Sequence, residues 1–267
     1  MVAGNDDQSR GGPGARAARL GELVRPTSGS FAGLTSNLNP AVAWKTLGRR
    51  RDWLAFARGI QIVPMDGLVR LGTGYGGYVV PGELISSDWV CYSAGLGEDA
   101  SFELELSRRY GCTVETFDPI PKSAAYMSSV VEANPLIRFH PWGLWSGDST
   151  QRFYAPIDPK HVSHSIANLQ ETETFIEAEC RSITSLMDEL GHDRLDLLKL
   201  DIEGAEYEVL DALIDAGIRP SVLCVDFHKV GTIDDMVAAV ARLRDVGLHP
   251  VHVYRTDVTL VGASHLP

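Results

Sequence analysis

Two apolar runs in the carboxy-terminal half of the chain are each followed by side chains that can exchange protons. Asp201 follows the run 195–200, and Asp226 and His228 stand at the end of the run 221–227. Because the carboxyl ends of neighbouring parallel strands meet at one edge of a sheet, we expect these three side chains to lie together. An imidazole with its ordinary pKa of about 6.5 suits proton abstraction at neutral pH, so His228 is predicted to be a general base.

The residues around His228 leave three roles open for it. Side chains alternate along a strand, so Asp226 is expected on the same face as His228, where its carboxylate would orient the imidazole. In a second interpretation, His228 is only a structural histidine at a strand end. In a third, Asp201, Asp226 and His228 hold Mg²⁺, which would acidify a substrate hydroxyl.

A glycine-containing turn earlier in the chain has the pattern of a nucleotide site. The segment SAGLGEDA, residues 93–100, joins an apolar strand to a helix, and Gly95 and Gly97 permit positive φ and close approach of a ligand. Asp118 stands 21 residues beyond Gly97, at the end of the next expected strand. A carboxylate there accepts hydrogen bonds from a ribose diol, which both nicotinamide dinucleotides and S-adenosylmethionine carry.

The residues after these glycines distinguish the two cofactors. A dinucleotide places its pyrophosphate at the start of the first helix, where backbone N–H groups and the helix dipole favour anions. Glu98 and Asp99 occupy that start and would repel a pyrophosphate, whereas S-adenosylmethionine carries an ammonium and a sulfonium. Asp99 can also cap the helix. The pair favours S-adenosylmethionine, and an NAD(P)-dependent sugar oxidoreductase is the alternative.

The elements that would position these residues alternate between strands and helices from Trp89 onward. Continuous apolar runs are typical of parallel strands that are buried on both faces. The alternation predicts an α/β fold with a doubly wound, mostly parallel sheet. The expected strands are 89–94, 113–117, 137–141, 195–200, 221–227 and 251–254, and the expected helices are 99–110, 122–133, 182–190, 204–216 and 232–246.

The residues before Trp89 are predicted to form a tail and a cap. Residues 1–30 are rich in Gly, Arg, Ser and Pro and are predicted to be a disordered tail. Residues 31–88 are predicted to form an N-terminal cap, with a basic helix up to Gly59 and a small hairpin within 60–86. The domain with the alternating elements would then cover 89–267.

Two segments outside the alternation could contribute to a substrate pocket. Residues 146–181 interrupt the strands and helices with a polar insertion, in which His161 and His164 are candidates for contact with an acceptor. In the cap, Tyr75 and Tyr78 flank two glycines and could form part of a lid, because tyrosine offers both a flat apolar face and a hydroxyl.

Charge and composition exclude several classes of function. The 267 residues include 24 basic and 35 acidic side chains, and residues 71–267 alone hold 14 against 30. This excess of acids argues against a nucleic-acid partner, which needs clustered Lys and Arg. No apolar run reaches the roughly 18 residues of a membrane span, and we expect no integral membrane contact. The basic helix before Gly59 is a candidate surface for a homo-oligomer.

The cysteines and the first residues point to a cytoplasmic protein. Cys91, Cys112, Cys180 and Cys224 are scattered without a CxxC pair, as expected for buried, reduced thiols. The first residues show no apolar stretch that could serve as the core of a signal peptide.

The segment LLKLDIEGAEYEVL, residues 197–210, resembles the signature of the FkbM family of S-adenosylmethionine-dependent methyltransferases. The segments SAGLGEDASFELEL and ETFDPIPKS, and the later FHPWGLW, HVSHSI and VDFH, occur in the order found in one branch of that family. The resemblance covers about residues 70–262. It implies a class I methyltransferase fold with a seven-stranded Rossmann-like sheet, and methyl transfer to a hydroxyl of a sugar, a polyketide or another small metabolite.

The resemblance also implies roles for individual residues. Asp201 would face the amine of the cofactor's methionine or the reacting centre. The other cofactor-binding residues it implies are Ser93, Gly95, Gly97 and Glu98 for the methionine part, Asp118 with Pro119 for the ribose, and Trp142, Gly143 and Leu144 for the adenine. Trp142 could equally serve hydrophobic packing. Tyr92 and Ser93 stand where the wider family has an early Asp, so the contacts of that Asp are not assigned.

Two further interpretations compete with a small-molecule methyltransferase. A non-catalytic binding module would keep the fold without the chemistry, but Asp118, Asp201 and His228 are all present. Methylation of RNA or DNA is disfavoured by the acidic composition and by the absence of a base-flipping motif.

Overall fold

The computed structural model describes residues 40–267, with side chains from residue 50 onward, so the tail predicted for residues 1–30 lies outside the described residues. The chain divides into two compact units, Met1–Thr46 and Leu47–Pro267. All the contacts below lie within the second unit.

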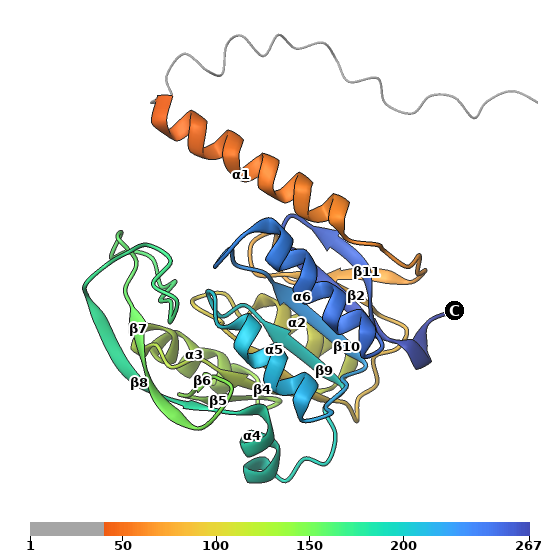
Figure 1. Ribbon diagram of the computed structural model, residues 1–267. Coiled ribbons are helices and arrows are strands. Elements are labelled where there is room, and N and C mark those ends of the chain that lie inside the picture. Colours follow the sequence, from red (N-terminus) through yellow and green to blue (C-terminus); the bar gives the residue numbers. More distant parts are fainter. Residues whose placement is uncertain (1–39) are drawn as a thin grey trace, which may run out of the picture. The chain divides into compact units, whose positions relative to one another are not determined.

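A seven-stranded sheet forms the centre of the second unit and has the order β11-β12-β10-β9-β3-β4-β5 (Figure 1). Neighbouring strands from β10 to β5 are parallel, and β12 is antiparallel to both β10 and β11. The strands are β3 (Val90–Ala94), β4 (Thr113–Phe117), β5 (Ile137–His140), β9 (Leu197–Leu200), β10 (Val222–Asp226), β11 (Leu248–Tyr254) and β12 (Asp257–Gly262). The predicted doubly wound, mostly parallel α/β fold is therefore confirmed.

Strand β12 is the one member of this sheet that the apolar pattern did not place. Only Arg255 and Thr256 separate it from β11, so the two strands read as one broken apolar segment. Arg255 makes the tight turn between them with a φ of 59°. A two-residue connection of this kind joins antiparallel strands.

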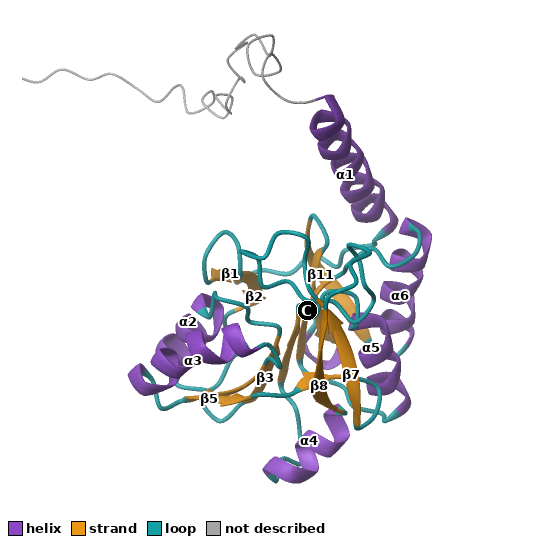
Figure 2. Cartoon of the chain, turned by 90° about the vertical axis from the view of Figure 1, so that its left-hand side faces the viewer, coloured by secondary structure: helices purple, strands orange, loops and turns teal. Residues whose placement is uncertain are grey.

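Helices cover both faces of the sheet (Figure 2). Leu198 and Leu200 pack with Leu210 and Val240, which belong to α5 (Glu206–Asp215) and α6 (Ile233–Asp245). On the other face, Leu197 packs with apolar residues of α2 (Ser101–Tyr110). The remaining helices are α3 (Pro121–Ala133), which packs near β5, and α4 (Ile183–Leu190), on the face of α5 and α6.

The segment before the sheet forms the helix and hairpin that were expected. Helix α1 covers Pro40–Gly59, and β1 (Leu68–Leu71) pairs with β2 (Tyr78–Pro81) in antiparallel fashion. The hairpin packs against the sheet, where the Thr259 hydroxyl donates to the Val79 carbonyl at 2.6 Å. The boundary at residue 89 and the oligomeric role of the helix stay predictions.

The insertion 146–181 has secondary structure of its own, which was not expected. Strands β7 (Ser149–Tyr154) and β8 (Phe175–Arg181) form an antiparallel pair, and β6 (Gly143–Leu144) joins the other edge of β8. The sequence did not reveal these strands because most of their side chains are exposed or half-buried. Only a small core around Phe153 and Cys180 is buried.

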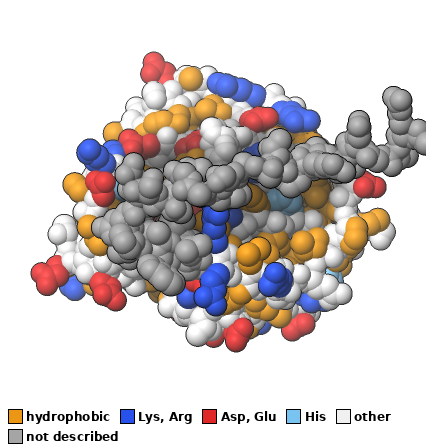
Figure 3. Space-filling model, turned by 90° about the horizontal axis from the view of Figure 1, so that it is seen from above, with side chains coloured by type: hydrophobic (Ala, Val, Ile, Leu, Met, Phe, Trp, Pro, Cys, Tyr) orange, Lys and Arg blue, Asp and Glu red, His pale blue; other side chains and the backbone are white. Residues whose placement is uncertain are grey.

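Two observations concern the expectations that the protein has no nucleic-acid partner and no integral membrane contact. On the described part of the face seen in Figure 3, acidic and basic side chains are interspersed rather than separated by sign. No helix in the described part of the chain combines the length and the apolar character needed to cross a membrane.

Candidate functional site

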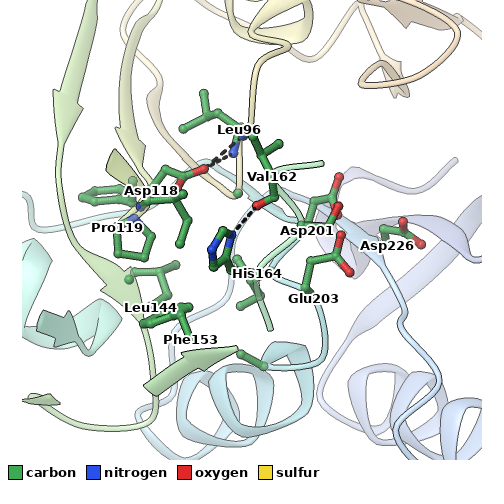
Figure 4. Close-up of a pocket in the computed structure, with 18 of the residues that line it drawn as sticks. Leu96, Asp118, Pro119, Leu144, Phe153, Val162, His164, Asp201, Glu203 and Asp226 are labelled. Carbon is green, nitrogen blue, oxygen red and sulfur yellow. Dashed lines mark hydrogen bonds between the residues drawn. The ribbon is translucent and has the colours of Figure 1, made fainter. Parts of the chain in front are cut away.

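A cavity of about 270 Å³ opens at the carboxyl ends of β3, β4, β9 and β10, where ligands of open α/β sheets bind (Figure 4). Its wall combines acidic side chains with an apolar side. The acids are Glu98, Asp99, Asp118, Asp201, Glu203 and Asp226, and the apolar side includes Phe117, Pro119, Ile120, Leu144, Phe153 and Ile166. The basic side chains in the wall are His164, Lys199 and His228.

The turn after β3 depends on glycine. Gly95 has a φ of 78°, and a Cβ atom placed on it would lie 1.7 Å from the carbonyl oxygen of Asp201. Its own N–H donates to the Phe117 carbonyl at 3.0 Å. Gly97 has a φ of 54° and faces Val162 of the insertion. Only glycine permits the turn to approach the end of β9 this closely.

Asp118 holds this turn from the end of β4. Its Oδ2 accepts hydrogen bonds from the N–H groups of Leu96 and Gly97, both at 3.0 Å, and its Oδ1 accepts from the Ile120 N–H at 2.9 Å. Burial raises the pKa of Asp118 even though all three bonds act to lower it. The ribose contact stays a prediction.

Two residues expected at the methionine end have other partners. Ser93 is fully buried outside the cavity wall and donates to Oε1 of Glu103 at 2.5 Å. That carboxylate pairs with Lys199, whose ammonium also donates to the Gly95 carbonyl. Ser93 therefore supports the glycine turn through Glu103 and Lys199 and does not line the cavity. Glu98 does line it, and its carboxylate pairs with Lys122 at 2.8 Å near the surface.

Asp99 is not the N-cap residue of α2, which is Ala100, but its carboxylate binds groups next to the start of the helix. Oδ1 of Asp99 accepts from the Ser101 N–H at 2.9 Å, and Oδ2 accepts from the Thr73 hydroxyl at 2.6 Å. An acid already occupies the place where a dinucleotide would put its pyrophosphate.

Trp142 does not line the cavity. Its ring stacks on His140 with centroids 5.2 Å apart, and the Arg181 guanidinium lies 5.5 Å from the ring on the insertion side. The packing interpretation of Trp142 therefore holds, and the adenine contact expected of it is not supported. Gly143 and Leu144 do line the cavity, as expected.

The segment DIEGAE forms a tight turn between β9 and α5 that brings further acids to the site. Glu203 and Gly204 have φ values of 51° and 101°. Glu206 is fully buried and accepts from the N–H groups of Ile202 at 3.1 Å and Gly204 at 2.9 Å. Glu203 and Glu206 were not among the predicted site residues. Their spacing around a glycine was the available signal.

His228 lies between three carboxylates. Its Nδ1 is 2.8 Å from Oε1 of Glu206, and its Nε2 is 3.1 Å from Oε2 of Glu203 and 3.9 Å from Oδ2 of Asp226. Burial alone lowers the pKa of His228, but the bonds to Glu203 and Glu206 outweigh it and raise the pKa far above its ordinary value.

The surroundings of His228 disfavour its predicted role as a general base. Both ring nitrogens lie within hydrogen-bond distance of a carboxylate, which favours the doubly protonated ring, and that form has no lone pair to accept another proton. The predicted proximity of Asp226 to the imidazole is correct.

Asp201 titrates much nearer to neutral pH than an ordinary aspartate. Burial, followed by the charge of Asp226, raises the pKa of Asp201 to about 8. Burial and Asp226 also raise the pKa of Asp257 to about 7. Asp226 itself accepts from the Thr256 hydroxyl at 2.6 Å. A carboxyl that titrates near the working pH is suited to accept a proton.

The structure brings together a candidate metal-ligand group that differs from the expected one. Asp201, Glu203 and His228 each offer a ligand atom within 4.8 Å of the others, with Glu203 in the place expected for Asp226. A magnesium ion prefers oxygen ligands, and it would have to displace a proton that the imidazole donates to Glu203. The donor set therefore fits Mg²⁺ poorly.

The insertion closes one side of the cavity through Val162, Ser163 and His164. Next to them, the Ser165 hydroxyl donates to the Glu203 carbonyl at 2.5 Å. His161 instead is exposed beside Asp158. In the cap, Tyr75 lines the cavity, whereas Tyr78 is buried against Phe102.

Comparisons with known proteins agree with this geometry. A family model described as the methyltransferase FkbM domain matches residues 93–247, more than half of the chain. Probable methyltransferase-like protein 24 of Homo sapiens is 32% identical over 124 residues, which make up 46% of this chain and 27% of that protein. Its Rattus norvegicus counterpart is 31% identical over 124 residues, 46% of this chain and 28% of that protein. The match thus spans about a quarter of the length of these relatives.

Two solved structures are similar at lower identity. Methyltransferase FkbM from Methylobacillus flagellatus KT has a TM-score of 0.45 at 14% identity, with 86% of this chain and 64% of that chain covered. Fibrillarin from Aeropyrum pernix, a complex with natively bound S-adenosyl-L-methionine, has a TM-score of 0.41 at 10% identity, with 76% and 86% covered.

Proposed function

The chain belongs to the FkbM methyltransferase family, and we propose that it transfers a methyl group from S-adenosylmethionine to a hydroxyl of a small molecule. S-adenosylmethionine supplies the methyl group on a positively charged sulfur. The acceptor class we propose is a sugar or a glycosylated or polyketide metabolite. The observation that carries the proposal is the acid-lined cavity above a glycine turn, at the carboxyl edge of the sheet.

The lining of the cavity supports a cationic cofactor over a dinucleotide. Six carboxylates line it, and two of its three basic side chains, Lys199 and His228, are already paired with carboxylates. A pyrophosphate would meet the carboxylates of Glu98 and Asp99 at the start of α2. This arrangement opposes the alternative of an NAD(P)-dependent oxidoreductase, because like charges repel.

Asp201 is the proton acceptor in our proposal. Its carboxylate lies in the cavity wall, and its pKa of about 8 gives it a useful fraction of the ionised form at neutral to mildly alkaline pH. His228 acts on the surroundings of Asp201: its positive charge holds Glu203 and Glu206 in place and so fixes the turn that carries Asp201. Asp226 tunes the pKa of Asp201 through its charge.

The remaining wall residues would orient the acceptor and exclude water. Segment 162–164 of the insertion covers one side, and Tyr75 stands at the acidic end, where Asp201 and Glu203 are among the charges that raise its pKa after burial. Alignment of the hydroxyl with the methyl group and exclusion of water are the main requirements of an in-line displacement. The surplus of carboxylates favours neutral or cationic acceptors over anionic ones.

A transfer assay tests this function. Purified protein would be incubated with S-adenosylmethionine labelled in its methyl group and with panels of neutral, amine-bearing and phosphorylated hydroxyl compounds. We expect label in a neutral or amine-bearing acceptor, as a methyl ether identified by mass spectrometry. Label on nitrogen, on carbon or on nucleic acid would contradict the proposed reaction.

Replacement of Asp226 by asparagine is expected to shift the pH dependence of the reaction. The charge of Asp226 raises the pKa of Asp201, so its removal lowers that pKa and moves the rising limb of the kcat profile from about pH 8 to lower pH. We expect a shift of roughly one pH unit, equivalent to about 1.4 kcal/mol. Glu208→Gln, which removes an exposed acid of α5, is the control. An unchanged profile in Asp226→Asn would remove Asp201 from the proton-accepting role.

Removal of divalent metal is expected to leave the reaction unchanged. Protein dialysed against a chelator should keep its kcat within about twofold, because the proton of His228 already satisfies the acids that would bind an ion. A loss of activity that added Mg²⁺ restores would instead assign Asp201, Glu203 and His228 as metal ligands.

A further inference from the structure

His164 presents a free hydrogen-bond acceptor to the cavity. Its Nδ1 lies 3.0 Å from the carbonyl oxygen of Val162, which can only accept, so Nδ1 carries the ring proton. In the neutral ring Nε2 then has the lone pair. Among the hydrogen bonds and ion pairs of the described residues, Nε2 of His164 has no partner, although the half-buried side chain lines the cavity. The protein's own fold thus leaves this acceptor unsatisfied.

The segment that carries His164 is anchored on both sides. Val162 packs against Gly97 of the turn after β3, and the Ser165 hydroxyl donates to the carbonyl of Glu203 after β9. The backbone of Ser165 also exchanges two hydrogen bonds with Tyr154 of β7. His164 is therefore held at a defined place over the cavity.

The ring lies on the apolar side of the cavity. Figure 4 shows it beside Pro119, Leu144 and Phe153, with the carboxylates of Asp201 and Glu203 on the other side. Pro119 follows β4, Leu144 belongs to β6 and Phe153 belongs to β7, and all three line the cavity. A flat, uncharged ring with a polar edge fits such a wall, because its faces can pack on apolar atoms while the edge meets His164.

We propose that Nε2 of His164 accepts a hydrogen bond from the exocyclic amine of the cofactor's adenine and thereby selects adenine over a 6-oxo purine. The inference rests on the proposed use of S-adenosylmethionine. Nε2 of His164 lies in partly apolar surroundings, where a hydrogen-bond acceptor without a donor costs free energy. The 6-amino group of adenine can supply that donor. The oxygen of hypoxanthine would bring an acceptor against an acceptor. Sites built around such a bond reject analogues that lack the donor.

The position of the ring distinguishes this role from that of a second base. A proton acceptor for the acceptor hydroxyl would have to lie at the acidic end, beside Asp201. The ring instead lies on the apolar side, and the fixed Nδ1 proton keeps Nε2 as the interacting atom.

Calorimetric titration with S-adenosylhomocysteine and S-inosylhomocysteine tests the inference. We expect the wild-type protein to bind the adenosyl compound at least tenfold more tightly. His164→Phe, which keeps a flat ring without the acceptor, should reduce this preference to less than about threefold. His164→Gln, which retains an acceptor oxygen, should keep part of it, and His161→Phe in the same insertion should keep all of it. Melting curves of each variant confirm folding.

The outcomes separate this inference from the proposed function. Tight binding of S-adenosylhomocysteine without discrimination by the wild type, or full discrimination by His164→Phe, overturns the role of His164 alone. Failure of the folded wild type to bind either compound overturns the proposed function and the inference together.

Discussion

Asp201→Asn is expected to lower kcat for methyl transfer by about a thousandfold, within the range that positioned general bases contribute. Asparagine keeps the shape of the side chain but cannot accept the proton. The turn around Asp201 should survive, because Gly95 contacts the backbone carbonyl of residue 201 rather than its side chain. The variant should therefore bind S-adenosylhomocysteine with an affinity within about tenfold of the wild type. A variant that keeps more than a tenth of the wild-type kcat would contradict the role of Asp201.

The same substitution is expected to stabilise the protein at alkaline pH. The pKa of Asp201 is raised in the folded state, so folding retains a proton that the unfolded chain loses above about pH 4. Stability is consequently lost as pH rises from about 4 to about 8, where the buried carboxyl finally ionises. The melting temperature of Asp201→Asn should exceed that of the wild type by roughly 3 °C or more at pH 8.5 and by less at pH 5. Asp215→Asn, at an exposed position of α5, should show no such difference.

Gly95→Ala is expected to abolish cofactor binding. The new methyl group would lie 1.7 Å from the carbonyl oxygen of Asp201, and alanine disfavours the φ of 78° at this position. The turns after β3 and β9 would have to separate, which would also disturb the hydrogen bonds of Asp118. We expect at least a hundredfold loss of affinity for S-adenosylhomocysteine and about 1–3 kcal/mol of lost stability.

Gly147→Ala is the matched control for this substitution. No atom lies within 4 Å of a Cβ placed on Gly147, in the insertion. This variant should bind and melt like the wild type. Wild-type affinity in Gly95→Ala would show that the close contact between the two turns is not required for the cofactor site.

The strands and the glycine turn could be predicted because their signals are local. Three of the four buried residues in β9 are leucines, and the positive φ angles of Gly95 and Gly97 in the turn after β3 favour glycine. The position of Asp118 could be predicted in the same way, because the apolar residues of β4 end directly before it. The fold class and the edge that carries the site were therefore accessible from the sequence.

The chemical state of the site was not accessible, because it depends on contacts between distant segments. His228 is disfavoured as a general base by Glu206, which lies 22 residues away in sequence and whose Oε1 is 2.8 Å from Nδ1 of the imidazole. Ser93 and Trp142 were placed on the correct segments, but their side chains point to Glu103 and His140 rather than into the cavity. The direction of each of these side chains depends on the partner it meets in the folded chain. A single sequence does not identify those partners.

The central claim, that the cavity holds S-adenosylmethionine rather than a nicotinamide dinucleotide, is tested most directly by calorimetric titration of the wild-type protein with S-adenosylhomocysteine and with NADH and NADPH. The acid-lined wall and the carboxylates of Glu98 and Asp99 before α2 predict saturable binding of S-adenosylhomocysteine and no measurable binding of either dinucleotide. Binding of NADH or NADPH in the absence of binding of S-adenosylhomocysteine would contradict it.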